Sequence, residues 1–289
     1  MEPLRVRGRL FYVKRDDLIH PYFSGNKFRK LQALIRLPAS RYRRLVSYGG
    51  VQSNAMLSMA ALARMKGWRF LYAVKAVPRT VREADGGNFA AATALGMEVT
   101  ELGYEGFYEK VENLKNSLGS KDLFIPQGGA DPVAEEGVKT LAGEITTWKK
   151  AAGHTHLDVV TPSGTGTTAL YLRRHLPSDI EVLTVPVVGD AQTLLAQWRR
   201  LASVDEPLPR ILEAETKWPF AKPHPDFLMI WRELEKAGIT FDLIYAPKTW
   251  RALFLEYEKT DRPILYVHSG GIYGNKTQLL RYMNEKARS

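Results

Sequence analysis

The sequence has 289 residues, 45% of them hydrophobic, which is enough apolar material for a large core and, we expect, for two lobes. Forty-one basic and 31 acidic residues give a net charge of +10, but the charge is spread along the chain, which argues against nucleic-acid binding as the main role. The absence of cysteine excludes disulfides, thiolate metal sites and a cysteine nucleophile.

No apolar run is long enough for a signal peptide or a membrane span, so we expect a soluble, cytoplasmic protein without a membrane partner. His154 and His156 are close in sequence, but no third ligand lies at metal-site spacing. We therefore expect no metal.

Residues 23–35, FSGNKFRKLQALI, predict a helix with Ser24 as its N-cap. Lys27 falls in the first turn, where a cation meets the positive end of the helix dipole at a cost of about 0.3–1 kcal/mol. Helical geometry places it nearer to Leu31 than to Arg29, which projects from the opposite face. An inward ammonium in an unfavourable position indicates a functional lysine.

Further along, short apolar runs alternate with helical patterns, which is typical of parallel sheets with crossover helices. The segment 203–226 is weakly patterned. We expect strands at 44–48, 69–77, 97–102, 123–126, 181–188, 241–245 and 263–271. We expect helices at 54–67, 88–96, 104–118, 133–153, 191–202 and 248–259. The segment 156–177 is expected to hold a strand, a glycine-rich loop and a helix, in that order.

Four loops follow expected strands: 47–54, 161–169, 244–248 and 267–271. Ligands of open α/β sheets gather at the carboxyl ends of the strands. We therefore expect the four loops to share one rim of the sheet with Lys27.

The first loop, SYGGVQSN, could bind a carboxylate through backbone N–H groups, the Ser53 hydroxyl and the Asn54 amide, or it could be an ordinary turn with Ser53 as the helix cap. In the third loop, Tyr245 could act as an acid or base, or could be a half-buried tyrosine with one hydrogen bond.

The second loop, TPSGTGTTA, lacks the lysine of a P-loop and the spacing of a dinucleotide motif, so a single phosphate group suits it better. Its glycines allow close backbone approach, and its hydroxyls can donate to an anion. The residues concerned are Ser163, Gly164, Thr165, Gly166, Thr167 and Thr168. A lysine, a phosphate site, a carboxylate site and hydroxyl donors together are the components of a pyridoxal-phosphate site.

Six motifs then carry a family resemblance. VKRDDL, SGNKFRKL, YGGVQSN, IPQGGA, SGTGTTA and HSGG occur in this order over nearly the whole chain. The set resembles the fold-type II pyridoxal-phosphate enzymes, in the branch with 1-aminocyclopropane-1-carboxylate deaminase and D-cysteine desulfhydrase. The resemblance implies a two-domain α/β fold with open, mostly parallel sheets. A larger cofactor-binding domain would hold 1–36 and 152–289, and a smaller one 37–151.

The resemblance also implies site roles and a homodimer. Lys27 would bond the cofactor covalently, act as the base when freed, and have a lowered pKa because it is buried near a helix start. Asn54 would bond the ring hydroxyl, the 163–168 segment would hold the phosphate, and Ser269 would face the pyridine nitrogen. Substrate contacts would come from Gln52, Ser53, Asn54 and Tyr245, with Ser53 and Tyr245 also catalytic.

The chain departs from the family at Ala55 and Met56, which follow Asn54 in place of polar residues, and at Ala246 and Pro247 after the late tyrosine. The apolar pair beside the carboxylate loop predicts a small, weakly polar substrate. We expect β-elimination or ring-opening deamination of a small amino acid. A β-replacing synthase of the cysteine-synthase type, a degenerate cofactor-binding homologue and a basic nucleic-acid-binding protein are the alternatives.

Overall fold

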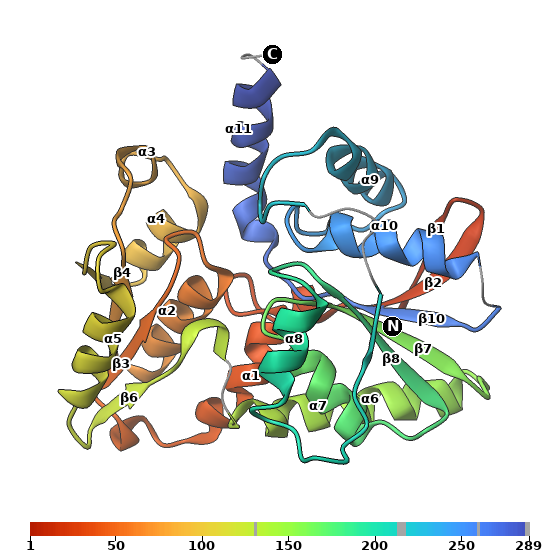
Figure 1. The fold of residues 1–289 in the computed structure, drawn as a ribbon, viewed down its shortest axis with the longest axis horizontal. Coiled ribbons are helices and arrows are strands. Elements are labelled where there is room, and N and C mark those ends of the chain that lie inside the picture. Colours follow the sequence, from red (N-terminus) through yellow and green to blue (C-terminus); the bar gives the residue numbers. More distant parts are fainter. Residues whose placement is uncertain (130–131, 213–217, 259–260, 287–289) are drawn as a thin grey trace.

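Two separate sheets organise the chain, as the computed structural model shows (Figure 1). The structure describes residues 1–129, 132–212, 218–258 and 261–286. The sheets form the centres of two lobes, with the helix after residue 24 between them. The expected α/β architecture of parallel sheets flanked by helices is confirmed.

The larger sheet has the strand order β1-β2-β10-β7-β8-β9, and only the β1–β2 pair is antiparallel. Its strands are β1 (Glu2–Val6), β2 (Arg9–Lys14), β7 (Leu157–Ser163), β8 (Ile180–Pro186), β9 (Arg210–Ile211) and β10 (Ile264–Val267). Because β10 and β7 are parallel neighbours, the loops after them open at the same edge.

The smaller sheet is parallel throughout, in the order β5-β4-β3-β6. Its strands are β3 (Arg44–Tyr48), β4 (Arg69–Val74), β5 (Met97–Glu101) and β6 (Asp122–Phe124). The expected strand–helix alternation of this segment is confirmed, and its first helix ends where expected, at Gly67 in the left-handed conformation (φ 68°).

Helices cover both sheets. On the larger sheet, one core cluster joins β1 and β2 to the helices after residue 224, and another joins β7 and β8 to the helices between residues 134 and 198. The helices are α1 (Gly25–Arg36), α2 (Asn54–Lys66), α3 (Arg79–Arg82), α4 (Gly87–Ala94), α5 (Phe107–Asn116), α6 (Ala134–Ala151), α7 (Thr167–His175), α8 (Ala191–Trp198), α9 (Pro225–Lys236), α10 (Ala246–Tyr257) and α11 (Asn275–Lys286). None of the helices in the described ranges has the length and apolar content that crossing a membrane needs.

One expected strand is wrong. Residues 241–245 form a bend rather than a strand, because Asp242 accepts the backbone N–H groups of Ile244 and Tyr245 and turns the chain into α10. The sequence patterns also missed β1, β2, α9 and α11.

The boundaries at 36/37 and 151/152 stay predictions. The packing of α6 supports an earlier division before Ala134, because its apolar side chains belong to the same core cluster as β7, β8 and α7. A Cβ added at Gly137 of α6 would lie 1.9 Å from the Arg29 carbonyl oxygen, so α1 and α6 are in backbone contact.

A buried charge cluster fixes α1 on its α6 side. Arg29 is 4% exposed, and its guanidinium donates two hydrogen bonds to Asp16 and two to Glu144, at 2.8–2.9 Å. Lys14 also pairs with both carboxylates. Arg29 therefore lies on the face of α1 opposite to Leu31, as expected. That face is buried, however, because Asp16 and Glu144 cover it.

Replacing Arg29 with Met should destabilise the protein by about 3–5 kcal/mol, because the fully buried Asp16 carboxylate would lose its main partner. The matched control is Arg36→Met on the same helix, where the exposed pair with Glu136 predicts a change within about 0.5 kcal/mol. Urea unfolding of both variants measures the difference. Equal stabilities would contradict the role assigned to the cluster.

Candidate active site

The start of α1 lies against the loop after β10. Gly25 has φ +60°, and a Cβ at this position would lie 1.9 Å from the Ser269 carbonyl oxygen. The Asn26 N–H donates to that same oxygen at 3.3 Å. Only glycine fits this approach, which brings Lys27 to the HSGG loop.

Lys27 is half-buried, and its Nζ donates to the Gly128 carbonyl at 3.3 Å. As expected, burial lowers the pKa of the Lys27 amine, from 10.5 to about 8. Lys30, one helical turn later, donates to the same carbonyl and to Thr165 Oγ1, each at 3.2 Å. Burial and the charge of Lys27 hold the pKa of Lys30 well below its usual value.

Sequence reasoning missed Lys30, although its spacing of three residues from Lys27 was a readable signal for a shared helix face.

The loop between β7 and α7 has the form of an anion site. Gly166 has φ +71°, and a Cβ there would lie 2.3 Å from Leu194 Cδ1. Thr165 and Thr167 share a hydrogen bond of 3.0 Å, whereas the buried Thr168 hydroxyl has no partner. Ser163 differs from its neighbours, because its hydroxyl is bonded to Thr184 within the sheet at 2.6 Å.

In the 47–54 loop, Ser53 is the N-cap of α2, and its Oγ accepts the N–H groups of Ala55 and Met56 at 3.1 and 3.4 Å. The phenol of Tyr72, a buried residue of β4 that the sequence patterns did not single out, donates to the Gly50 carbonyl of this loop at 3.5 Å and interacts with the Ser53 hydroxyl. The cap interpretation of Ser53 is confirmed, while its catalytic and substrate roles stay predictions.

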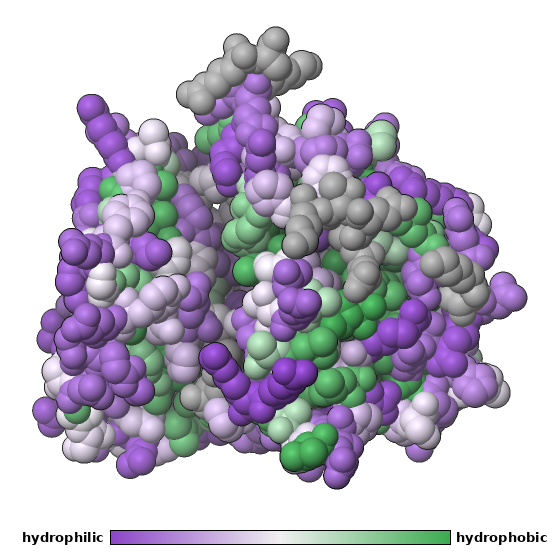
Figure 2. Space-filling view, viewed as in Figure 1, coloured by the Kyte–Doolittle hydropathy of each residue, from purple (hydrophilic) through white to green (hydrophobic). Residues whose placement is uncertain are grey.

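A small pocket brings together Lys27, Asn54 and Ser269. A Cβ added at Gly271 would lie 2.3 Å from Asn54 Nδ2, so the amide touches the loop after β10. Gln52 lies beside them, but its Oε1 accepts the Phe89 N–H at 3.4 Å. Figure 2 shows that the surface is hollowed between the two lobes.

The loop after β10 is held by His268, which is fully buried. His268 Nδ1 accepts the Gly270 N–H at 3.1 Å, and the ring lies 2.9 Å from the Thr240 carbonyl oxygen through Nε2. These two bonds and the stacked Phe241 ring fix the turn that carries Ser269.

Tyr245 lies next to the anion loop, since a Cβ at Gly164 would be 3.5 Å from its phenol oxygen. Burial, and then the nearby Asp242 carboxylate, raise the pKa of this phenol well above its usual value. Tyr245 therefore stays protonated at neutral pH and is suited to donate a hydrogen bond rather than to act as a base.

Two expectations about the arrangement are wrong. The loops do not share one rim, because the 47–54 loop belongs to the smaller sheet, and 244–248 follows no strand. Ala55 and Met56 do not line the carboxylate loop, because both side chains are buried in the core of the smaller lobe. They therefore carry no information about the substrate.

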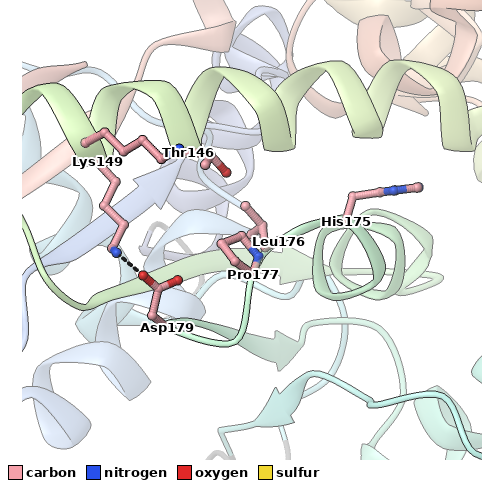
Figure 3. A pocket seen from close by; sticks show the side chains of 7 residues that line it. Thr146, Lys149, His175, Leu176, Pro177 and Asp179 are labelled. Carbon is pink, nitrogen blue, oxygen red and sulfur yellow. Dashed lines mark hydrogen bonds and ion pairs between the residues drawn. The ribbon is translucent and has the colours of Figure 1, made fainter.

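A separate pocket lies beside α6 and α7 (Figure 3). It has a volume of about 440 Å³, and Lys149 pairs with Asp179 in its wall. It contains none of the expected site residues. Across the described ranges, no group of three His, Asp or Glu side chains has the arrangement of a metal site.

Comparison with known proteins decides the family. The model of the family described as "pyridoxal-phosphate dependent enzyme" matches residues 3–234. The chain belongs to this family.

Curated relatives of this pyridoxal-phosphate dependent enzyme fall in two groups by name. A Thermotoga maritima protein provisionally named as a 1-aminocyclopropane-1-carboxylate deaminase is 26% identical over 292 residues, 92% of this chain and 90% of the relative. The D-cysteine desulfhydrase of Serratia proteamaculans is also 26% identical, over 91% of this chain and 87% of its own length.

Solved structures show the same fold. A structure described as an ACC deaminase homologue has a TM-score of 0.72 and 24% identity, covering 95% of this chain and 89% of its own. A hydrogen sulfide-producing enzyme from Fusobacterium nucleatum has a TM-score of 0.65 and 17% identity, over 94% of this chain and 93% of its own.

The residues present fit pyridoxal phosphate. The buried, unpartnered Thr168 hydroxyl and the Lys30 ammonium at Thr165 are suited to a phosphate dianion. A lysine with a lowered pKa stands at the other end of the site. The individual contacts assigned from sequence to Asn54, the 163–168 segment and Ser269 stay predictions.

In the cofactor-free protein, Lys27 should react with an amine-specific acylating reagent with a midpoint near pH 8. About half of its amine is neutral at that pH, whereas a lysine with an ordinary pKa has less than about 1% in the neutral form. Mass spectrometry of peptides after brief labelling at pH 6–11 measures the midpoint. The exposed Lys139 of α6 is the internal reference, and a Lys27 midpoint equal to that of Lys139 would contradict the prediction.

Proposed function

We propose that this enzyme is a pyridoxal-phosphate dependent lyase or deaminase that acts on a small amino acid, by β-elimination or by ring-opening deamination. The observation that carries the proposal is Lys27, whose lowered pKa and position beside Asn54 and Ser269 suit a covalent and general-base role. The names of the relatives, which include D-cysteine desulfhydrase, support the same reaction class.

In this proposal the bound cofactor supplies an aldehyde for the amine of the substrate and an electron-withdrawing ring. Lys27 holds the cofactor and, once released, takes a proton from the substrate, because its amine is largely neutral above pH 8. Lys30 and the hydroxyls of Thr165 and Thr168 hold the phosphate. The substrate carboxylate is received by the backbone N–H groups of the 49–54 loop other than those of Gly49 and Ser53, which donate to the Ala73 and Gly50 carbonyls.

Two hydroxyl groups remain for proton handling. The Tyr245 phenol, kept neutral by burial, donates a hydrogen bond beside the anion loop. The Ser53 hydroxyl interacts with the Tyr72 phenol, and burial raises the pKa of that phenol, so it stays protonated and donates to the Gly50 carbonyl. Ser53 is assigned to proton transfer at the substrate.

The homodimer and the cytoplasmic location are part of the same proposal. The homodimer rests on the family resemblance, and the location rests on the sequence-based expectation above. Light scattering of the purified protein measures the first. A mass close to the 32.6 kDa of one chain would contradict it.

The purified protein with added pyridoxal phosphate should show a near-visible absorption band that borohydride removes, and Lys27→Ala should abolish the band. The variant should also lose about 10²- to 10⁴-fold in kcat, the range for a general base. Lys139→Ala, on the exposed face of α6, is the matched control and should keep the absorption band and the wild-type kcat.

The substrate is then identified with D- and L-amino acids and 1-aminocyclopropane-1-carboxylate, assayed for pyruvate, 2-oxobutyrate, ammonia and sulfide. Release of a keto acid with ammonia supports the proposal. A band without any of these products would favour a degenerate homologue, and products that appear only with an added nucleophile would favour a β-replacing synthase.

A further inference from the structure

Asn88 is a buried polar residue to which no sequence motif assigns a role. It is the second residue of α4 in the smaller lobe, and it is 1% exposed. Its side chain faces the 47–54 loop rather than the core, because both of its hydrogen-bond partners belong to that loop. The Asn88 and Asn54 amides are in contact, so the orientation of one, oxygen or nitrogen toward the other, determines the orientation of the other.

The hydrogen bonds fix that direction. Asn88 Nδ2 donates to the Gln52 carbonyl oxygen at 2.9 Å and to Asn54 Oδ1 at 2.7 Å. A backbone carbonyl can only accept, so Asn88 must present its NH₂ group to the loop. Both amide protons are then used, and Asn54 must present its oxygen to Asn88. The orientation of the second amide is thus set by a backbone carbonyl that cannot change its role.

This orientation determines where the Asn54 amide nitrogen, Nδ2, points. Its Nδ2 lies on the side of Gly271, where an added Cβ would come within 2.3 Å, and Asn54 lines the pocket with Lys27 and Ser269. Asn54 therefore offers a hydrogen-bond donor to this side. A flipped amide would offer an oxygen there, which repels an anionic ligand oxygen.

The first turn of α4 is held firmly enough to impose this orientation. Gly87 packs against Thr277 of the larger lobe, where an added Cβ would lie 2.5 Å from the threonine Cγ2. Lys276 Nζ donates to the Asp85 carbonyl at 2.8 Å. The segment that carries Asn88 is thus fixed to the start of α11, in the other lobe.

We propose that Asn88 is a positioning residue that locks Asn54 as a hydrogen-bond donor toward the ring oxygen of the bound cofactor. The proposal rests on the assignment of Asn54 to that ring oxygen. Asn88 contributes no contact to the cofactor itself. It acts through Asn54 by keeping the amide from rotating.

The test uses an asymmetric pair of variants, Asn54→Asp and Asn88→Asp. Asp at 54 keeps an oxygen that accepts from Asn88, so unfolding of the cofactor-free protein should occur at the same urea concentration as in the wild type. Asp at 88 cannot donate to Gln52 or to Asn54, so this variant should unfold at lower urea. The reversed order of stabilities would mean that Asn54 presents its nitrogen to Asn88, and would overturn the proposal.

The second readout is the absorption spectrum of the holoprotein without substrate, because the ratio of its two cofactor bands reports whether the ring oxygen carries a proton. Asn54→Ala, Asn54→Asp and Asn88→Ala should all shift this ratio toward the protonated form. They should also weaken pyridoxal-phosphate binding by about 10-fold or more, the loss expected for one hydrogen bond to a charged group. Asn113→Ala, on the exposed face of α5, is the control and should change neither.

The double variant Asn54→Ala/Asn88→Ala separates positioning from a general structural effect. If Asn88 acts through Asn54, the double variant should show the same band ratio as Asn54→Ala alone. Additive shifts, or an Asn88→Ala spectrum equal to that of the wild type, would overturn the proposal. An unchanged spectrum in Asn54→Ala would remove the assignment of Asn54 and the inference with it, but would leave the lyase function, which is tested at Lys27, untouched.

Discussion

The docking of α1 between the two lobes is the constraint on which the site depends. At its start, the absence of a Cβ at Gly25 allows the helix backbone to reach the Ser269 carbonyl. Along one face, Leu31 and Leu34 enter the core of the smaller lobe, and on another face Arg29 is held by two carboxylates from different elements. A helix fixed on three sides cannot rotate, so the direction of Lys27 follows from packing that involves no substrate.

The same docking places two lysine ammonium groups close together, an arrangement that a bound anion would stabilise. The half-buried Lys27 and the buried Lys30 lie on one face of the first turns, and each donates to the single carbonyl of Gly128. Burial removes water from both ammonium groups, and a carbonyl oxygen replaces that hydration only in part, which is why both pKa values are lowered. A phosphate at Thr165 and a covalent bond at Lys27 would each remove part of this cost. The unfavourable Lys27 seen in the sequence is therefore one of a pair, and in the function proposed above Lys30 is the member that binds the phosphate.

The sequence predicted the parallel part of the fold well, because buried strands and crossover helices leave strong apolar periods. It failed where a partner distant in sequence decides the outcome. Residues 241–245 are apolar enough for a strand, but the Asp242 carboxylate bonds the local backbone and forms a bend. Helical periodicity predicts Arg29 to be exposed, but Glu144 of α6, 115 positions later in the sequence, covers it. By contrast, α9 was readable, since Phe227, Ile230, Trp231 and Leu234 follow helical spacing.

At the site, motifs identified the lysine, the anion loop and the HSGG loop, but not the residues that orient them. His268 shows why such residues matter. Its Nδ1 accepts the Gly270 N–H, so in the neutral ring Nε2 carries the proton and donates it to the Thr240 carbonyl. Both nitrogens are thus committed, and His268 has no proton to offer toward the cofactor. If Ser269 faces the pyridine nitrogen, as its position in this loop favours, the ring meets a neutral hydroxyl in place of a carboxylate partner. The ring then withdraws electrons less strongly, which suits loss of a β-substituent better than transamination.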